Sequence, residues 1–361
     1  MKKSAAFGVL ILLLTVTTAV LMGLFQTGFP ADGTFFERSE SAISENIPFR
    51  EGLQTLMTKI RYRSGVRYFD GIYIGKDGSL LPEAEKPASR VLATAKSYVS
   101  AFAERKPGDT YFMLIPTSVV IKQDSIASYA ADGLYNQRQF INSFYSDIYK
   151  TVGTVDVYQD LYNRRQEYIF YHTKDLPTSL GGYYLYEELA GRLEFRAKPL
   201  SAFSVAYTEH DFYGSLATKA LAPYAKPDFL TLYEEVPEHR HYTVTHWADG
   251  KKTETKGLYL PYGEGLSDKT DRVLGGLSAV TEITAEGSEE SSLLVFCDET
   301  AKSWLPFLAG HYGRITAIDL NEATDTELSA IALDDYSQVL FAYGFRAFSE
   351  GVNFGRLEKI P

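Results

Sequence analysis

Cysteine is almost absent from this sequence: Cys297 is the single cysteine among 361 residues. An intrachain disulfide is therefore excluded. Positive charge is also scarce, because 36 Lys and Arg residues stand against 46 Asp and Glu residues and the formal net charge is −10. Binding to DNA or RNA needs a basic surface, so the composition gives no reason to expect a nucleic-acid partner.

Charged residues are missing altogether from Ala5–Phe25, which is rich in Leu, Val and Ala. A helix of about 20 apolar residues crosses the hydrocarbon core of a bilayer. Lys2 and Lys3 precede this run, and basic residues stay on the cytosolic side of a membrane. No A-x-A-like cleavage site follows Leu24, so we favour an uncleaved anchor, with a cleaved signal peptide as the alternative.

This anchor predicts a single-pass protein of the plasma membrane with most of the chain outside the cytosol. The expected division is a cytosolic stub (1–4), a transmembrane signal anchor (5–25), a spacer (26–46) and an extracytoplasmic domain (47–361).

Beyond the anchor, apolar runs alternate with helical periodicity, which favours an α/β fold with a mainly parallel central sheet. The predicted strands are Thr110–Pro116, Val152–Tyr158, Tyr168–His172, Ser201–Glu209, Phe229–Glu235, Ser292–Asp298, Arg314–Asp319 and Ser337–Tyr343. The predicted helices are Ile47–Ser64, Glu83–Arg105, Asn136–Lys150, Gly181–Leu193, Ala301–Tyr312 and Asp325–Leu333. Hairpins are expected at Tyr68–Leu81 and, as a solvent-facing β insertion around Asp249-Gly250, at His241–Leu260.

The stretch Glu167–Leu189 indicates where the chemistry lies. A strand is predicted to lead into the loop Thr173–Leu180, and a helix to open behind Thr178 or Ser179 as its N-cap. The carboxyl end of a strand beside a helix N-terminus is where α/β proteins place their functional groups.

The same stretch resembles the DHHW proteins, extracytoplasmic relatives of the SGNH-type hydrolases and O-acetyltransferases. The family pattern Y-Y-x-T-D-H-H-W-T-x-L-G-A-Y-Y-A-Y is matched by Tyr171, Thr173, Thr178, Leu180, Gly181, Tyr183, Tyr184 and Tyr186. Four further family phrases occur elsewhere in the chain in the family's order: GIYIGKDG and FMLIPTSVVI before this stretch, and DFYGSL and PFLAGHY after it. The resemblance implies a three-layer α/β/α fold of the SGNH-hydrolase type, in permuted order.

The positions that carry the family's chemistry hold other residues here. The resemblance places the Ser nucleophile at Glu299, the Asp and His of the acid–base pair at Lys174 and Leu176, and the Asn oxyanion donor at Leu277. A carboxylate cannot be acylated like a serine and repels a developing oxyanion, while leucine transfers no proton. The site is therefore expected to be degenerate, with a new ion pair between Glu299 and Lys174 as one hypothesis.

Nearby residues could replace the lost groups. His172, Asp175 and Ser303 are the candidates for such a relocated site, although His172 is expected on the strand and Ser303 along the helix. For Asp298 we predict the role of capping the next helix rather than catalysis. For DFYGSL the favoured interpretation is a packing turn with Gly214 at positive φ, and the alternative is a substrate-facing loop.

A metal site is not expected. His239, His241 and His246 lie close in sequence, but alternation places the last two on opposite faces of a strand, so we interpret all three as surface residues. Neither the residues nor the resemblance implies a cofactor.

The predicted function is that of a non-catalytic DHHW-like protein that binds a cell-surface glycan or a membrane-bound O-acyltransferase during polysaccharide acylation. One alternative is an active O-acetyltransferase or esterase with relocated residues. The other is a purely structural scaffold of the cell envelope.

Overall fold

The computed structural model describes residues 50–220, 224–236, 240–248, 250–261, 265–287 and 291–361. They belong to two units, of which the first is represented by helix α3 (Arg50–Arg63), predicted at Ile47–Ser64. The second unit consists of Tyr68–Ala220 and Tyr224–Pro361 and contains everything discussed below. The predicted anchor at residues 5–25 lies outside the described residues, and no helix within them is long and apolar enough to cross a membrane.

An eight-stranded sheet forms the centre of the second unit, in the order β5-β4-β13-β11-β12-β10-β8-β9. The strands are β5 (Gly153–Val155), β4 (Thr110–Ile115), β13 (Gln338–Gly344), β11 (Ser292–Cys297), β12 (Arg314–Ile318), β10 (Val280–Ala285), β8 (Tyr242–Ala248) and β9 (Lys251–Lys256). Pairing is parallel from β5 to β12 and antiparallel from β12 to β9.

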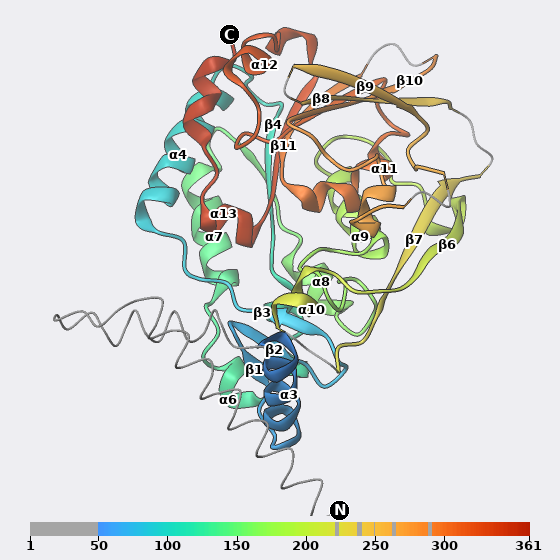
Figure 1. Cartoon of the computed structure of the whole chain (residues 1–361). Helices are drawn as coiled ribbons and strands as arrows, with labels where there is room; N and C mark the ends of the chain where they lie inside the picture. The colour runs from blue at the N-terminus through green and yellow to red at the C-terminus, as the bar shows by residue number, and fades with distance from the viewer. Residues whose placement is uncertain (1–49, 221–223, 237–239, 249, 262–264, 288–290) are drawn as a thin grey trace, which may run out of the picture. The chain divides into compact units, whose positions relative to one another are not determined.

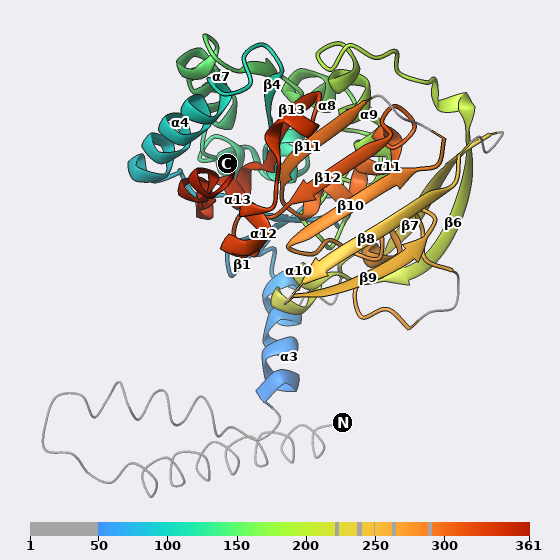
Figure 2. The ribbon, with the colours of Figure 1, turned by 90° about the horizontal axis from the view of Figure 1, so that it is seen from above.

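The sheet is therefore mixed, whereas the sequence suggested a mainly parallel sheet with a separate hairpin. The predicted hairpin is β8–β9, and it extends the central sheet because β10 joins it to β12 (Figure 2). Strand β10 was missed by the sequence analysis because its six residues, VTEITA, show no regular apolar-polar alternation and lie between loops rich in Ser, Gly and Glu. The outer strand β9, KKTETK, carries three lysines, which discourage pairing with another chain.

Helices cover both faces of the sheet, which gives the expected three layers (Figure 1). Alternate side chains of each strand enter different cores, as Phe112 and Leu114 do on one face and Met113 and Ile115 on the other. The first core includes α4 (Ser89–Ala103), α7 (Gln137–Ile148), α12 (Asp325–Ser329), α13 (Phe345–Glu350) and η6 (Phe354–Lys359). The second includes α5 (Ser118–Ile121), α8 (Tyr158–Asn163), α9 (Ser179–Ala190) and α11 (Leu305–Leu308).

Two smaller sheets accompany the central one. Strands β1 (Tyr68–Phe69), β2 (Ile72–Ile74) and β3 (Leu80–Pro82) are antiparallel, and β2–β3 is the hairpin predicted around Asp77-Gly78. Strands β6 (Phe203–Phe212) and β7 (Asp228–Glu235) form an antiparallel ribbon. The remaining elements are α6 (Ser128–Ala131), α10 (Ser215–Lys219), η1 (Gln123–Ser125), η2 (Leu200–Ala202), η3 (Lys269–Arg272), η4 (Glu299–Ser303) and η5 (Leu333–Asp335).

Two predicted elements are wrong in the segments that build the site. Residues 168–172 form no strand of a sheet, because the chain folds back on itself and Phe170 pairs with Pro177 instead. The helix predicted at Ala301–Tyr312 is broken into η4 and α11, because Pro306 lacks the N–H that a continuous helix needs there.

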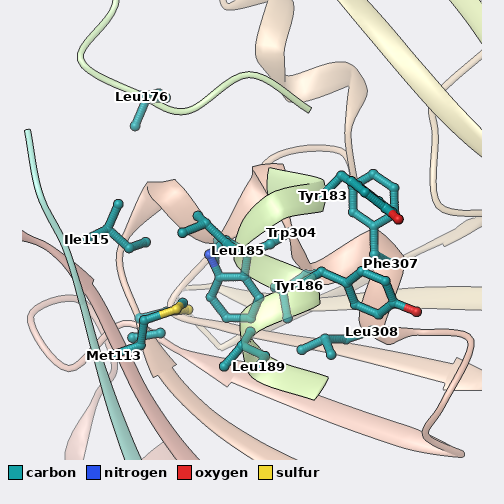
Figure 3. Close-up of a cluster of buried hydrophobic side chains, with 14 of the residues drawn as sticks. Met113, Ile115, Leu176, Tyr183, Leu185, Tyr186, Leu189, Trp304, Phe307 and Leu308 are labelled. Atoms are coloured by element: carbon teal, nitrogen blue, oxygen red, sulfur yellow. The ribbon is translucent and has the colours of Figure 1, made fainter. Parts of the chain in front are cut away.

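Helix α9 lies unusually close to its neighbours through two glycines. Thr178 caps the helix by accepting a hydrogen bond from Gly181 N, as predicted. A Cβ at Gly181 would lie 2.2 Å from Ile169 O, and one at Gly182 would lie 1.9 Å from Ser303 O. Beyond the glycines, Leu185 and Leu189 lie beside Trp304 in the core, and the ring of Tyr186 stacks on Phe307 (Figure 3). Gly182 thus allows α9 to pack directly against the η4 segment, and Gly181 allows it to pack against Ile169.

Replacing Gly182 by alanine tests this close approach. Because the atom in the way is a backbone oxygen that cannot rotate aside, we expect Gly182→Ala to lower the free energy of unfolding by more than about 3 kcal/mol. At Gly191, which ends the same helix with a φ of −69°, an added Cβ would meet no atom of the described residues within 4 Å. Gly191→Ala should therefore change stability by only about 0–1 kcal/mol. Equal losses in guanidinium unfolding of the two variants would contradict the packing described.

Candidate functional site

The carboxyl ends of three parallel strands meet at the edge of the sheet where Asp298 lies. Its carboxylate accepts hydrogen bonds from Thr300 N at 3.0 Å and from Gly344 N at 2.9 Å, so it joins the end of β11 to the end of β13. Asp298 is the N-cap of η4, which confirms its predicted role. Burial raises the pKa of Asp298 to about 6, and the opposing effect of these hydrogen bonds is smaller.

The loop after residue 172 is held at this edge by Asp228, the first residue of β7. Asp228 is buried and accepts from His172 N at 2.5 Å, Thr173 N at 2.9 Å, the Thr173 hydroxyl and the Tyr168 hydroxyl at 2.7 Å. Burial alone would raise the pKa of Asp228, but contacts from His172, Thr173 and Tyr168 outweigh it and lower the pKa. Nothing in the sequence singled out this residue, since its partners are 55–60 positions away.

The four positions that the resemblance singled out lie in two pockets on either side of the Asp298-Glu299 turn. Lys174, Leu176 and Glu299 line one pocket of about 340 Å³. Leu277 and Glu299 line a second pocket of about 430 Å³ on the other side of the turn. The two residues before Leu277 are glycines with positive φ, at 76° and 89°, a conformation that favours glycine over residues with a side chain. The four positions inferred from the resemblance thus lie close to the same turn in the folded protein.

Two buried lysines and three carboxylates fill the centre of this cluster. Lys174 Nζ lies 2.5 Å from Asp268 Oδ2 and 3.8 Å from Glu299 Oε2, so the predicted Glu299–Lys174 ion pair is present. Lys302 Nζ lies 3.0 Å from Asp271 Oδ1 and 3.7 Å from Glu299 Oε2. We call this group of five charged residues the ion-pair cluster.

A buried hydroxyl links the two lysines of the ion-pair cluster. Both ammonium groups donate to Thr270 Oγ1, at 3.1 Å from Lys174 and 3.0 Å from Lys302. Burial on its own would raise the pKa of Asp268, but the hydrogen bond from Lys174 prevails and lowers it to about 2. The sequence analysis missed Lys302, although its spacing of three residues from Glu299 within one helical turn was a usable signal.

Leu176 contributes an apolar wall to the pocket of Lys174 and Glu299. Its side chain is 5% exposed and belongs to the core formed with Ile115 and Met113, as Figure 3 shows. Because it is saturated hydrocarbon, it can neither accept a proton from a hydroxyl nor return one to a leaving group.

The candidates for a relocated site are not brought together. His172 Nδ1 lies 3.3 Å from Asp228 Oδ1, and Asp175 is bound to Arg346 at 2.7 Å and to Ser118 at 2.9 Å. Ser303 is buried and donates to Thr300 O at 2.7 Å. Asp175 and Ser303 therefore have hydrogen-bond partners of their own, and His172 only lies beside Asp228. The described contacts contain no hydrogen bond between any two of the three candidates.

Two further predictions are corrected by the structure. Gly214 has a φ of −85° and not the predicted positive φ. Glycine is needed there for space instead, because a Cβ would lie 2.1 Å from Lys174 Cγ. His246 is partly buried rather than on the surface, and its Nε2 lies 2.8 Å from Leu274 O. His239 lies outside the described residues, and among those described no group of His, Cys, Asp and Glu could hold a metal ion.

Comparison with known proteins gives a consistent picture. Residues 97–318 match the family described as DHHW protein, whereas no curated protein matches the sequence. A DHHW family protein from Eubacterium siraeum has a similar structure, with a TM-score of 0.67 at 19% identity over 81% of this chain and 96% of that one. Bacillus cereus PatB1, solved with a sulfonyl adduct, gives a TM-score of 0.62 at 15% identity over 76% of this chain and 94% of that one.

At these identities the two structures establish a shared fold and nothing more. The family match covers more than half of the sequence and includes the loop at Lys174 and the end of β11 at Glu299. The chain belongs to the DHHW family.

Proposed function

We propose that this protein is a non-catalytic member of the DHHW family that binds glycan during the acylation of a cell-surface polysaccharide. The observation that carries the proposal is the ion-pair cluster, which occupies the place where the family's acylation chemistry is expected. Glu299 has the nucleophile's position, and the ammonium groups of Lys174 and Lys302 lie 3.8 and 3.7 Å from its carboxylate.

The chemistry of these residues supports an inert pocket. An ester is attacked by a hydroxyl or thiol that a neighbouring base activates. Thr300, beside Glu299, has its hydroxyl bound to Asp298, and no imidazole is among the described residues that line the pocket of Lys174 and Leu176. Glu299 would also place a negative charge where an oxyanion has to form.

The pocket itself suits binding. Lys219 at its wall brings positive charge and Glu350 brings acceptor oxygens, so hydroxyl-rich ligands find both kinds of partner. The family resemblance implies a membrane-bound O-acyltransferase as a protein partner. Membrane attachment through residues 5–25 belongs to the same proposal and rests on the sequence alone.

Labelling with a sulfonyl fluoride tests the absence of a nucleophile. PatB1 of Bacillus cereus has been solved with a sulfonyl adduct and serves as the positive control. For the full chain we expect no increase in mass, and no hydrolysis of p-nitrophenyl acetate above that of Glu299→Ala. Glu299→Ser should also remain unlabelled, because Leu176 offers no base. An adduct mapped to a side chain of this pocket, with turnover lost on its substitution, would overturn the proposal.

Replacing Lys174 by methionine tests the ion-pair cluster as a unit. The change removes the buried ammonium group and leaves Asp268 and Glu299 with Lys302 alone, so we expect the free energy of unfolding to fall by about 1–3 kcal/mol. Lys219, an exposed residue of the same pocket, is the matched control. Lys219→Met should change stability by less than about 0.5 kcal/mol. Guanidinium unfolding that shows the same small effect for both variants would contradict a structural role of the cluster.

A further inference from the structure

A third pocket, of about 470 Å³, lies apart from the Glu299 site. His172 is among its lining residues, whereas Lys174, two positions later, lines the Glu299 pocket. The two pockets therefore lie on either side of Thr173, whose amide and hydroxyl are both bound to Asp228. No function described so far uses this third pocket.

Aromatic rings form one part of its lining. The rings of Tyr168 and Phe229 stack with centroids 4.5 Å apart, and those of Tyr168 and His172 stack at 4.7 Å. The Tyr168 hydroxyl donates a hydrogen bond to the buried Asp228 carboxylate, which holds the stacked rings in place. Rigid rings at a pocket wall offer apolar contact to a flat ligand at little cost in conformational entropy.

The imidazole of His172 is not satisfied within the described part of the protein. Asp228 already accepts four hydrogen bonds, which is the capacity of a carboxylate. The buried Nδ1 of His172 accordingly lies near that carboxylate without a hydrogen bond to it. Because Nδ1 is buried against Asp228, His172 contributes its ring, stacked on Tyr168, to the lining of the third pocket.

The charged residues of the third pocket fall into paired and unpaired groups. Lys122 is bound to Asp77 at 2.6 Å, and Arg165 to Asp124 at 2.6 Å. Lys76 Nζ donates to the carbonyl oxygen of Asp124 at 2.9 Å, not to a carboxylate. Lys226 is exposed, and its ammonium group has no contact with a carboxylate of the described residues. Positive charge is therefore in excess here, in a chain whose net charge is −10.

This combination selects a class of ligand. A bare anion would face the carboxylates of Asp77, Asp124 and Glu167, and an apolar ligand would leave the polar side chains unpaired. A sugar ring has C–H faces that lie against aromatic rings and hydroxyl groups that both donate and accept. An acidic substituent on the sugar would pair with the two available ammonium groups.

We infer that the third pocket binds a pyranose residue that carries a carboxylate, as part of an acidic polysaccharide. Phe229, Tyr168 and His172 contact the ring, and Lys76 and Lys226 contact the carboxylate. The inference takes the class of ligand in common with the proposed function but depends on a different pocket. Loss of sugar binding at the third pocket would contradict this inference, and ester chemistry at Glu299 would contradict the proposed function. The two results are separate, so one statement can fail while the other stands.

Isothermal titration of the full chain with tri-galacturonate, maltotriose and inorganic phosphate tests the inference. We expect tri-galacturonate to bind, maltotriose to bind roughly tenfold more weakly, and phosphate not to compete. The double variant Lys76→Ala/Lys226→Ala should weaken tri-galacturonate binding by roughly tenfold or more and leave maltotriose unchanged. Phe229→Ala should weaken both sugars. The matched control is Lys256→Ala, an exposed lysine of β9 outside the pocket.

Both lysines of the double variant are exposed, so its fold is expected to stay intact, and circular dichroism checks this. Binding that is unaffected by the double variant and by Phe229→Ala overturns the inference, as does equal binding of phosphate. The inference is also overturned if neither tri-galacturonate nor maltotriose binds. Binding that is lost only in Lys219→Met would move the sugar to the Glu299 pocket, which leaves the proposed function standing and removes this site.

Discussion

The buried carboxylate of Asp228 is the contact on which the functional part of this protein depends. Its two oxygens accept four hydrogen bonds from Tyr168, His172 and Thr173, residues that form no regular strand or helix. A loop normally lacks the backbone pairing that fixes its shape, and here one side chain supplies the missing partners. Because Thr173 is held in this way, His172 lines one pocket and Lys174 the other.

The ion-pair cluster shows how the scaffold accommodates two buried lysines beside the Glu299 pocket. Burying two ammonium groups is costly unless each has opposite charges and hydrogen-bond acceptors nearby. Lys174 and Lys302 meet this condition by sharing Thr270 and by facing carboxylates from the segment 268–271 and from Glu299. Lys174 and Glu299 are therefore complementary in charge within the ion-pair cluster.

Under the proposed function and the further inference, both pockets beside Thr173 would bind the same polysaccharide chain. A polysaccharide chain presents the same ring repeatedly, and two moderate sites on one protein raise the overall affinity when one chain can reach both. A member of this family without ester chemistry would then still locate acidic glycan for an acylating partner. The mixed sheet supports the Glu299 pocket, since Asp298 joins β11 to β13 at the edge where this pocket opens.

Local signals in the sequence were sufficient for much of this protein. Continuous apolar runs identified β4, β11, β12 and β13, a Thr before a Gly-Gly helix identified the cap of α9, and spacing to family phrases identified Lys174, Leu176, Leu277 and Glu299 as one group. Only the tertiary structure showed that residues 168–172 form no strand of the sheet and that β10 joins the hairpin to it. It alone also showed that Asp228 holds the loop before Lys174, and that Lys302 and the segment 268–271 complete the ion-pair cluster. The physical reason is range: periodicity and caps act within a few residues, whereas hydrogen bonds to a buried carboxylate and ion pairs across 94 positions exist only after the chain has folded.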